Sequence, residues 1–179
     1  MKITKVTEDA VATLLDDLLK RSPNNYTGYA DKVQAIIDDV RERGDEALFE
    51  MTKRFDGADL NADNIRVTQA EIDEAYTLVD ASLIEVIRKA MTNIRVYHEK
   101  QRQYGWFDTT PDGTILGQKV TPLQSTGVYV PGGKAAYPSS VLMNVIPAKV
   151  AGVEKIVMVT PPGKDGKVNP GTLVAANEA

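Results

Sequence analysis

The chain has 179 residues, of which 42% are hydrophobic and 26% charged, a composition typical of a soluble globular protein with one domain or one domain and an arm. Its 21 Lys and Arg residues against 25 Asp and Glu residues give a net charge of −4, which argues against nucleic acid as a partner. The sequence contains no cysteine, which excludes disulfides and thiolate metal sites and favours a cytoplasmic protein. No apolar run approaches the ~18 residues of a membrane span, so no membrane partner is expected.

Three amphipathic helices are predicted at the start of the chain. Thr7 is expected to cap the first, whose apolar stripe continues to Leu19. The second has apolar residues at helical spacing and ends at Gly44, and Asp45 caps the third, which stops at Gly57. Each helix has a single apolar face, which predicts packing on the second half of the chain or on another subunit.

Two capping boxes mark the helices that follow. The pairs are Thr68 with Glu71 and Ser82 with Glu85, each a hydroxyl residue followed three positions later by an acid. The second box is expected to open the longest helix, which continues to about Gln103. Its predicted buried seam consists of Leu83, Ile87, Ala90, Met91, Ile94 and Tyr97.

The character of the sequence changes from helical spacing to turns and strands after Tyr104. Residues 106–113 read as a turn-rich linker that contains the turn signal Asp112-Gly113, and residues 114–120 and 123–130 read as strands. We therefore divide the chain into a helical N-terminal region, residues 1–104, and an incomplete Rossmann-like region, residues 105–179.

A strand, a glycine turn, a helix and a second strand follow one another in the second region. The apolar run 127–130 ends in the Pro-Gly-Gly turn at 131–133, and the serines at 139–140 are expected to cap a helix that ends at Gly152. Residues 155–159 read as a second buried strand. Because such a βαβ unit implies a parallel sheet, the predicted fold class is α/β.

A binding site is predicted where these strands end, because ligands of open α/β sheets lie beyond the carboxyl ends of the strands. Pro131, Gly132 and Gly133 form the turn at that edge, and the loop from Thr160 to Gly163, with Pro161 as the assigned residue, follows the next strand as the expected opposite wall. Tyr129 precedes the turn and could either fill the core or pack its ring on a ligand. The turn matches neither the dinucleotide fingerprint nor the P-loop, so a plain strand-to-helix turn stays open beside nucleotide binding.

Catalytic groups are not predicted within this chain. His98 is the single histidine, and without cysteine it cannot build a zinc site of the usual kind. Its place on the longest helix favours a position at the core edge or the helix surface. No Ser-His-Asp or Cys-His arrangement can be formed, so no catalytic and no metal-ligating residue is assigned.

Several motifs spread over the chain closely resemble those of one family, the histidinol dehydrogenases. The matching runs are Gly127 to Gly133, Ser139 to Met143, Ile146 to Ala148, Ala151 to Val153, Arg43 to Leu48, Phe55 to Gly57, and Ile94 with His98 and Gln101. They occur in the order expected of that family and cover most of the chain.

The resemblance implies a specific activity for the complete protein. Histidinol dehydrogenases oxidise L-histidinol through the aldehyde to L-histidine, with two NAD+ consumed, in histidine biosynthesis. The family's enzymes are homodimers with incomplete Rossmann-like domains, use zinc to hold the substrate, and contact NAD with a tyrosine that falls on Tyr129 here. Family chains are more than twice as long, and their zinc ligands and catalytic Glu-His pair lie outside the present sequence.

The resemblance therefore predicts an N-terminal portion that carries part of an NAD site and is inactive alone. The unfinished pattern at the end of the sequence agrees, since Pro170 opens a helix that has no Gly cap at its end and no following strand before Ala179. Two other interpretations are open: a non-catalytic α/β binding or assembly module, and a different α/β enzyme whose glycine turn binds another phosphate compound.

Overall fold

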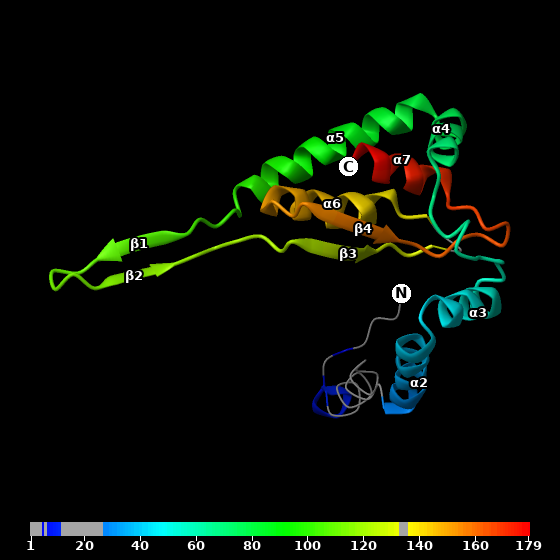
Figure 1. Cartoon of the computed structure of the whole chain (residues 1–179), viewed down its shortest axis with the longest axis horizontal. Helices are drawn as coiled ribbons and strands as arrows, with labels where there is room; N and C mark the ends of the chain where they lie inside the picture. Colours follow the sequence, from blue (N-terminus) through cyan, green and yellow to red (C-terminus); the bar gives the residue numbers. More distant parts are fainter. Residues whose placement is uncertain (1–4, 6, 12–26, 133–135) are drawn as a thin grey trace. The chain divides into compact units, whose positions relative to one another are not determined.

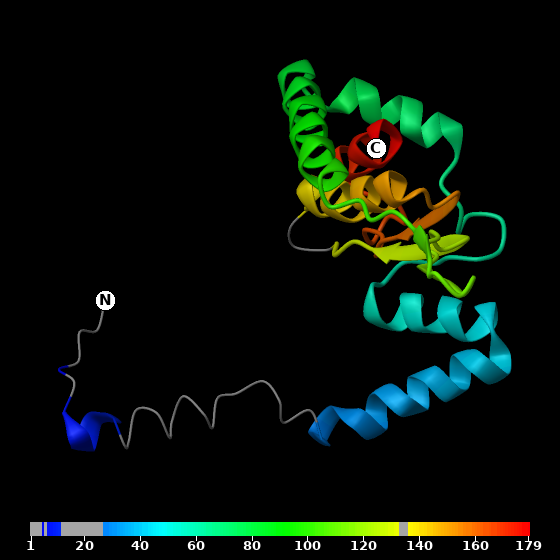
Figure 2. The ribbon, with the colours of Figure 1, turned by 90° about the vertical axis from the view of Figure 1, so that its left-hand side faces the viewer.

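The computed structural model describes residues 5, 7–11, 27–132 and 136–179 (Figures 1 and 2). The chain forms two compact units, residues 1–47 and residues 48–179. The division of the chain at residue 104, which the change in sequence character suggests, stays a prediction.

The first unit begins with the helix that Thr7 was expected to cap. The Thr7 hydroxyl accepts a hydrogen bond from the Ala10 backbone N–H at 3.2 Å, which confirms the cap. The rest of the predicted stripe, to Leu19, lies outside the described residues. Helix α2 (Thr27–Arg43) follows, with an Arg43–Asp39 ion pair of 2.6 Å that holds the pKa of Asp39 below its usual value.

Helix α3 (Asp45–Phe55) begins directly after Gly44, so Asp45 is its first residue rather than its cap, and Gly44 separates it from α2 with a positive φ of 61°. Helix α4 (Gln69–Leu78) begins at the first predicted capping box. The Glu71 N–H donates to the Thr68 hydroxyl at 3.3 Å, and the Thr68 N–H donates to the Glu71 carboxylate at 2.7 Å. These bonds confirm the box, and the backbone bond from Thr68 lowers the pKa of Glu71.

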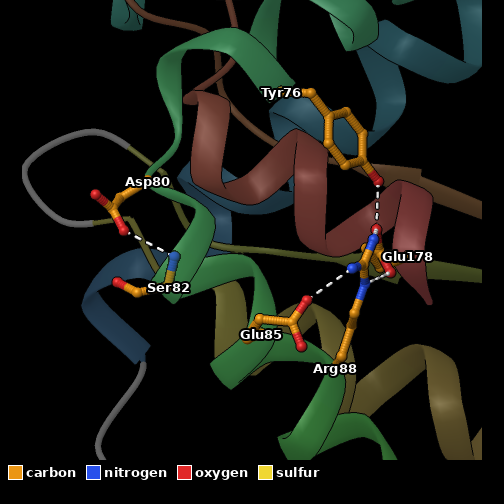
Figure 3. Close-up of polar contacts among 6 residues, drawn as sticks. All are labelled: Tyr76, Asp80, Ser82, Glu85, Arg88 and Glu178. Carbon is orange, nitrogen blue, oxygen red and sulfur yellow. Dashed lines mark hydrogen bonds and ion pairs between the residues drawn. The ribbon is translucent and has the colours of Figure 1, made fainter.

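The second predicted capping box is wrong. Helix α5 (Ala81–Glu99) begins earlier than expected, because the Asp80 carboxylate caps it by accepting the Ser82 N–H at 2.7 Å. The Glu85 carboxylate forms an ion pair with Arg88 at 2.9 Å instead of a capping box with Ser82 (Figure 3). An aspartate two residues before a serine thus takes the capping role from it.

The buried face of α5 is close to the predicted seam but rotated slightly. Ile87 is buried as expected, and Ala90, Met91 and Ile94 are partly buried. Ile84 is buried in place of Leu83, which is exposed together with Tyr97. The helix therefore turns a narrower face toward its neighbours than the apolar pattern indicates.

The predicted linker at 106–113 is also wrong, because its first half forms a strand. Strand β1 (Trp106–Thr109) pairs antiparallel with β2 (Ile115–Gln118) in a hairpin (Figure 1). The Asp112-Gly113 turn is confirmed: Gly113 has a φ of 86°, and Asp112 accepts the Thr114 N–H at 3.2 Å. All residues of both strands are exposed, so the polar and apolar pattern alone did not reveal the pairing.

The predicted βαβ unit is confirmed. Strand β3 (Ser125–Tyr129), helix α6 (Pro138–Ala151) and strand β4 (Lys155–Val159) follow in order, and β3 pairs parallel with β4. The helix begins at Pro138 rather than at a serine cap, since proline is favoured in a first helical turn. Gly152 ends it in the left-handed conformation, with a φ of 92°. The fold is therefore α/β, with an incomplete Rossmann-like sheet.

The core of the second unit lies on one face of this sheet. Val128 and Val130 of the β3 segment pack toward α6, while alternate residues of both strands are exposed on the other face, so β4 is only half buried. Helix α7 (Pro170–Glu178) packs against α4, α5 and α6 (Figure 2). In the described ranges, no helix is long and apolar enough to cross a membrane.

A polar network joins three of these helices (Figure 3). The Arg88 guanidinium donates two hydrogen bonds to the Glu178 carboxylate, at 2.8 and 2.9 Å. The Tyr76 hydroxyl donates to the same carboxylate at 2.8 Å and accepts from the Asn177 amide at 3.0 Å. These bonds connect α4, α5 and α7 and hold the end of α7 against the helical layer.

Candidate functional site

The carboxyl ends of β3 and β4 lie side by side, as the parallel pairing requires. Tyr129 is in register with Val159, and the Val130 N–H donates to the Val159 carbonyl at 2.9 Å. Each strand then leaves the sheet through a proline, at Pro131 and Pro161. The structure therefore brings the predicted walls of the site to one sheet edge.

Gly132 lies directly against the segment that follows β4. A methyl group at this position would lie 2.8 Å from the Pro161 carbonyl oxygen and 3.3 Å from the Thr160 hydroxyl. A contact of 2.8 Å between a Cβ and a backbone oxygen is essentially never seen, so the approach of the two segments requires glycine. Gly133, the other glycine of the predicted turn, lies outside the described residues.

Tyr129 does not fill the core. Its residue surface is 61% exposed, and its ring lines a cavity of about 420 Å³ together with apolar side chains such as Leu60, Val67 and Val159. Tyr129 and Val159 contribute to it from the exposed face of the strands, and Met158 and Leu173 contribute from the side of the core. An exposed ring beside aliphatic side chains forms a surface on which a flat aromatic ligand can pack.

A second cavity, of about 360 Å³, adjoins the first. Both cavities are lined by Thr160, Pro161 and Val168, so they lie on the same segment after β4. The second cavity also reaches Asn169 and Thr172 at the start of α7. It is the more polar of the two, because hydroxyl, carboxamide and charged groups contribute to its wall.

Charged groups at the second cavity are largely paired. The Lys167 ammonium donates to the Glu74 carboxylate at 2.9 Å, which raises the pKa of Lys167. The Asp165 carboxylate accepts the Lys167 backbone N–H at 3.1 Å. Among the described residues, two carboxylates thus interact with Lys167, one through its ammonium and one through its backbone N–H.

Thr160 belongs to the loop expected as the opposite wall, whereas the sequence argument missed Asn169 and Thr172. Asn169 caps α7 by accepting the Gly171 and Thr172 N–H groups at 2.9 and 3.3 Å. An asparagine before a proline that opens a helix is a recognised cap signature, so the start of α7 was predictable. That this helix start faces the turn after β3 depends on tertiary packing.

His98 lies away from this edge. It is half-buried in the last turn of α5, where its Nδ1 lies 2.6 Å from the Gln101 Oε1, and it lines a separate cavity of about 380 Å³ beside Pro122 and Pro147. This confirms the expected position at a core edge. Within the described part of the chain, no group of three or more His, Cys, Asp or Glu residues could hold a metal ion.

The residues present fit part of a dinucleotide. Gly132 lets the two strand exits meet, Tyr129 offers an aromatic face, and the second cavity supplies hydrogen-bonding groups. Pro131 is exposed beside them at the strand end. The arrangement can bind and orient a ligand, and the described residues at this edge do not form a nucleophile–base pair.

A sequence model of the family "Histidinol dehydrogenase" matches residues 19–179. Histidinol dehydrogenase of Heliobacterium mobile is 54% identical over 164 residues, which cover 92% of this chain and 38% of that protein. Histidinol dehydrogenase of Bacillus subtilis is 59% identical over 161 residues, covering 89% of this chain and 37% of that protein.

The fold is similar to a solved structure as well. The crystal structure of histidinol dehydrogenase from Elizabethkingia anophelis matches with a TM-score of 0.77 and 37% sequence identity, covering 83% of this chain and 34% of that one. The chain thus spans between a third and two fifths of the length of the relatives it matches. With a family match over nearly its whole length, the chain belongs to the histidinol dehydrogenase family.

Proposed function

We propose that this chain supplies the N-terminal portion of a histidinol dehydrogenase. The complete protein would oxidise L-histidinol through the aldehyde to L-histidine, with two NAD+ reduced in succession. The family match over residues 19–179 carries this proposal, because it extends far beyond the short glycine turn.

The role of this chain in that reaction is to hold part of the NAD. Tyr129, Pro131, Gly132, Gly133 and Pro161 are the proposed contact residues. Their support is geometric: the ring of Tyr129 is exposed in a cavity, and the Gly132 backbone meets Pro161 at the carboxyl ends of parallel strands. When bound, NAD supplies the hydride acceptor, and these residues orient it.

Other parts of the proposal concern the complete protein. The described residues do not assemble a metal-binding group, so zinc, if used, would be held by residues beyond those described. We further propose a homodimer in the cytoplasm, as the family resemblance and the cysteine-free composition suggest. The 179-residue chain alone is expected to be inactive.

The product of the complete reading frame that encodes this chain, here called the full gene product, tests the proposal. Incubated with L-histidinol and NAD+, it should form two NADH for each L-histidine, whereas the 179-residue chain should form none. If the reading frame ends at Ala179 and the measured mass of the intact protein agrees with that frame, the result would instead support a non-catalytic binding or assembly module. NADH production by the 179-residue chain would refute its proposed inactivity.

A further inference from the structure

The cavity of about 380 Å³ beside His98, here called the His98 cavity, lies at the other end of the sheet from Tyr129 and Gly132. It is lined by the end of α5, the base of the β1–β2 hairpin and the last turn of α6, which Figure 1 shows next to one another. Residues 120–122 precede β3 and residues 150–151 precede β4, so the cavity lies at the amino ends of both strands. It is therefore separate from the edge proposed for NAD.

Close backbone packing fixes the walls of the His98 cavity. A Cβ added at Gly105 would lie 2.8 Å from the Gln118 carbonyl oxygen, so glycine is required where the chain leaving α5 passes the end of β2. A Cβ added at Gly152, which ends α6, would contact the Pro122 ring at 3.5 Å. Walls that are already in place lose little conformational entropy when a ligand binds.

Arg102 brings positive charge to this cavity. Among the described residues that line it, none is an aspartate or a glutamate. Within the described part of the chain no carboxylate pairs with Arg102, whereas Arg43 and Arg88 both form ion pairs. The Arg102 guanidinium carbon lies 5.3 Å from the centroid of the Tyr104 ring, which positions the group. An arginine held in a concave wall without acids favours a negatively charged ligand.

The helix ends at the His98 cavity do not cancel this charge. The C-terminal ends of α5 and α6 carry partial negative charge, which cations near the last turn offset. Lys100 caps α5, and Lys149 lies in the last turn of α6. Of the charged residues next to lining residues in the sequence, three are lysines and one is an acid: Lys100, Lys119, Lys149 and Glu99. Arg102 is therefore available to a ligand.

Amide and hydroxyl donors stand beside the arginine. The Gln101 Oε1 lies 2.6 Å from the His98 Nδ1, which leaves the Gln101 Nε2 as a donor. The side chains of Gln103 and Thr121 also line the cavity, and neither has a hydrogen bond within the described residues. A guanidinium with neighbouring N–H and O–H donors matches the two oxygens of a carboxylate, which it binds through two parallel hydrogen bonds.

The opposite part of the wall is apolar. Val120, Pro122, Pro147 and Val150 contribute to it, so a ligand with a hydrocarbon body can be held there while its charged end meets Arg102. A single guanidinium balances the one charge of a carboxylate, whereas a phosphate with two charges calls for more than one cation or a group of free backbone N–H donors.

We propose that the His98 cavity is a second ligand site, which binds a small organic acid through its carboxylate, with Arg102 as the residue that recognises the charge. The apolar body of the acid packs on the prolines and valines of the wall. Because the site lies at the amino ends of the strands, its ligand and NAD do not compete for the same residues.

Equilibrium binding to the full gene product tests the proposal, with benzoate, its neutral analogue benzamide and phenyl phosphate as probes. Benzoate should bind about tenfold more tightly than benzamide, because only benzoate pairs with the guanidinium. Arg102→Gln should remove this preference, and Arg102→Lys should keep part of it, since lysine retains the charge without the planar fork. Lys100→Gln removes an equal charge outside the wall and should change benzoate binding by less than about twofold.

Several outcomes would overturn the proposal. Equal affinities for benzoate and benzamide, or no binding of either to the folded native protein, would do so. Equal losses in Arg102→Gln and Lys100→Gln would show that general surface charge is the cause. Tighter binding of phenyl phosphate than of benzoate would refute the carboxylate assignment, and displacement of benzoate by NAD+ would refute a separate site. Unchanged thermal midpoints show that the variants are folded.

Discussion

Gly132 and Pro161 lie so close together that only a hydrogen fits between the Gly132 Cα and the Pro161 carbonyl. An added Cβ at position 132 would be 2.8 Å from that oxygen. The two residues follow different strands, so their contact holds the exits of β3 and β4 together. The relationship defines the edge at which we place the cofactor.

Gly132→Ala should therefore separate the two strand exits. We expect a loss of stability of about 1–3 kcal/mol, the usual cost of an overpacked position, and weaker NAD+ binding. Chemical unfolding and calorimetric titration of the full gene product measure the two effects. Gly127→Ala is the matched control. Gly127 lies on β3, and a Cβ added there would meet no atom within 4 Å. Equal behaviour of both variants would contradict the proposed role of Gly132.

Tyr129→Ala should weaken NAD+ binding by about tenfold, because stacking of a base on an aromatic ring contributes about 1–3 kcal/mol. Tyr129→Phe should bind NAD+ almost as the native protein does, since the ring is retained. The stability of both should change little, as the residue is exposed rather than part of the core. Tyr97→Ala, which removes an exposed ring from α5, is the control. An unchanged dissociation constant in Tyr129→Ala would count against the NAD site.

The ion pair between Arg88 and Glu178 should make the free energy of unfolding depend on pH. Hydrogen bonds from Arg88, and then from Tyr76, hold the pKa of Glu178 below its ordinary value of 4.5, and the Glu178 side chain is only 15% exposed. Because the folded pKa is lowered, the stabilisation is complete above the unfolded pKa and is lost as pH falls through the folded pKa.

Glu178→Gln should accordingly be less stable than the native protein near neutral pH. The difference in unfolding free energy should shrink as pH falls below about 4.5, which denaturant titrations at a series of pH values would show. Glu85→Gln removes the other, well-exposed carboxylate bonded to Arg88 and should have a much smaller effect. A pH-independent difference between Glu178→Gln and the native protein would argue against the ion pair.

Ile146 and Met143 provide a test of the core on a single helix. Ile146 is fully buried on α6, so Ile146→Ala should cost about 2–5 kcal/mol through lost burial and a residual cavity. Met143 is 64% exposed on the same helix, and Met143→Ala should change stability by less than about 1 kcal/mol. Thermal or denaturant unfolding of the two variants distinguishes them, and similar losses would contradict the packing described.

The sequence by itself predicted features that depend on neighbours in the chain. The Thr68–Glu71 capping box and the left-handed Gly152 are satisfied by bonds within a few residues, so residue type and spacing suffice to identify them. The βαβ unit was predictable for a related reason, since an apolar run, a helix of the right length and a second run allow few arrangements. Family motifs added the NAD assignment at Tyr129, which stays a proposal.

Two physical causes explain the predictions that were wrong: competition between neighbouring caps, and a strand that depends on its pairing partner. Asp80 and Ser82 are both good caps two positions apart, and sequence spacing does not show which backbone N–H each will meet. Strand β1 depends on pairing with residues 115–118, and its residues are exposed on both faces, so no alternating apolar pattern marks it.

Only the tertiary structure decided which residues share the candidate site. Tyr129, Gly132 and Thr172 belong to a strand, a turn and a distant helix, and the packing of α7 against α4 and α6 brings the last of them to the sheet edge. The exposure of Tyr129 and the burial of Thr172 also arise from this packing. The physical reason is that burial and hydrogen-bond satisfaction depend on contacts between segments far apart in the chain, which local spacing does not specify.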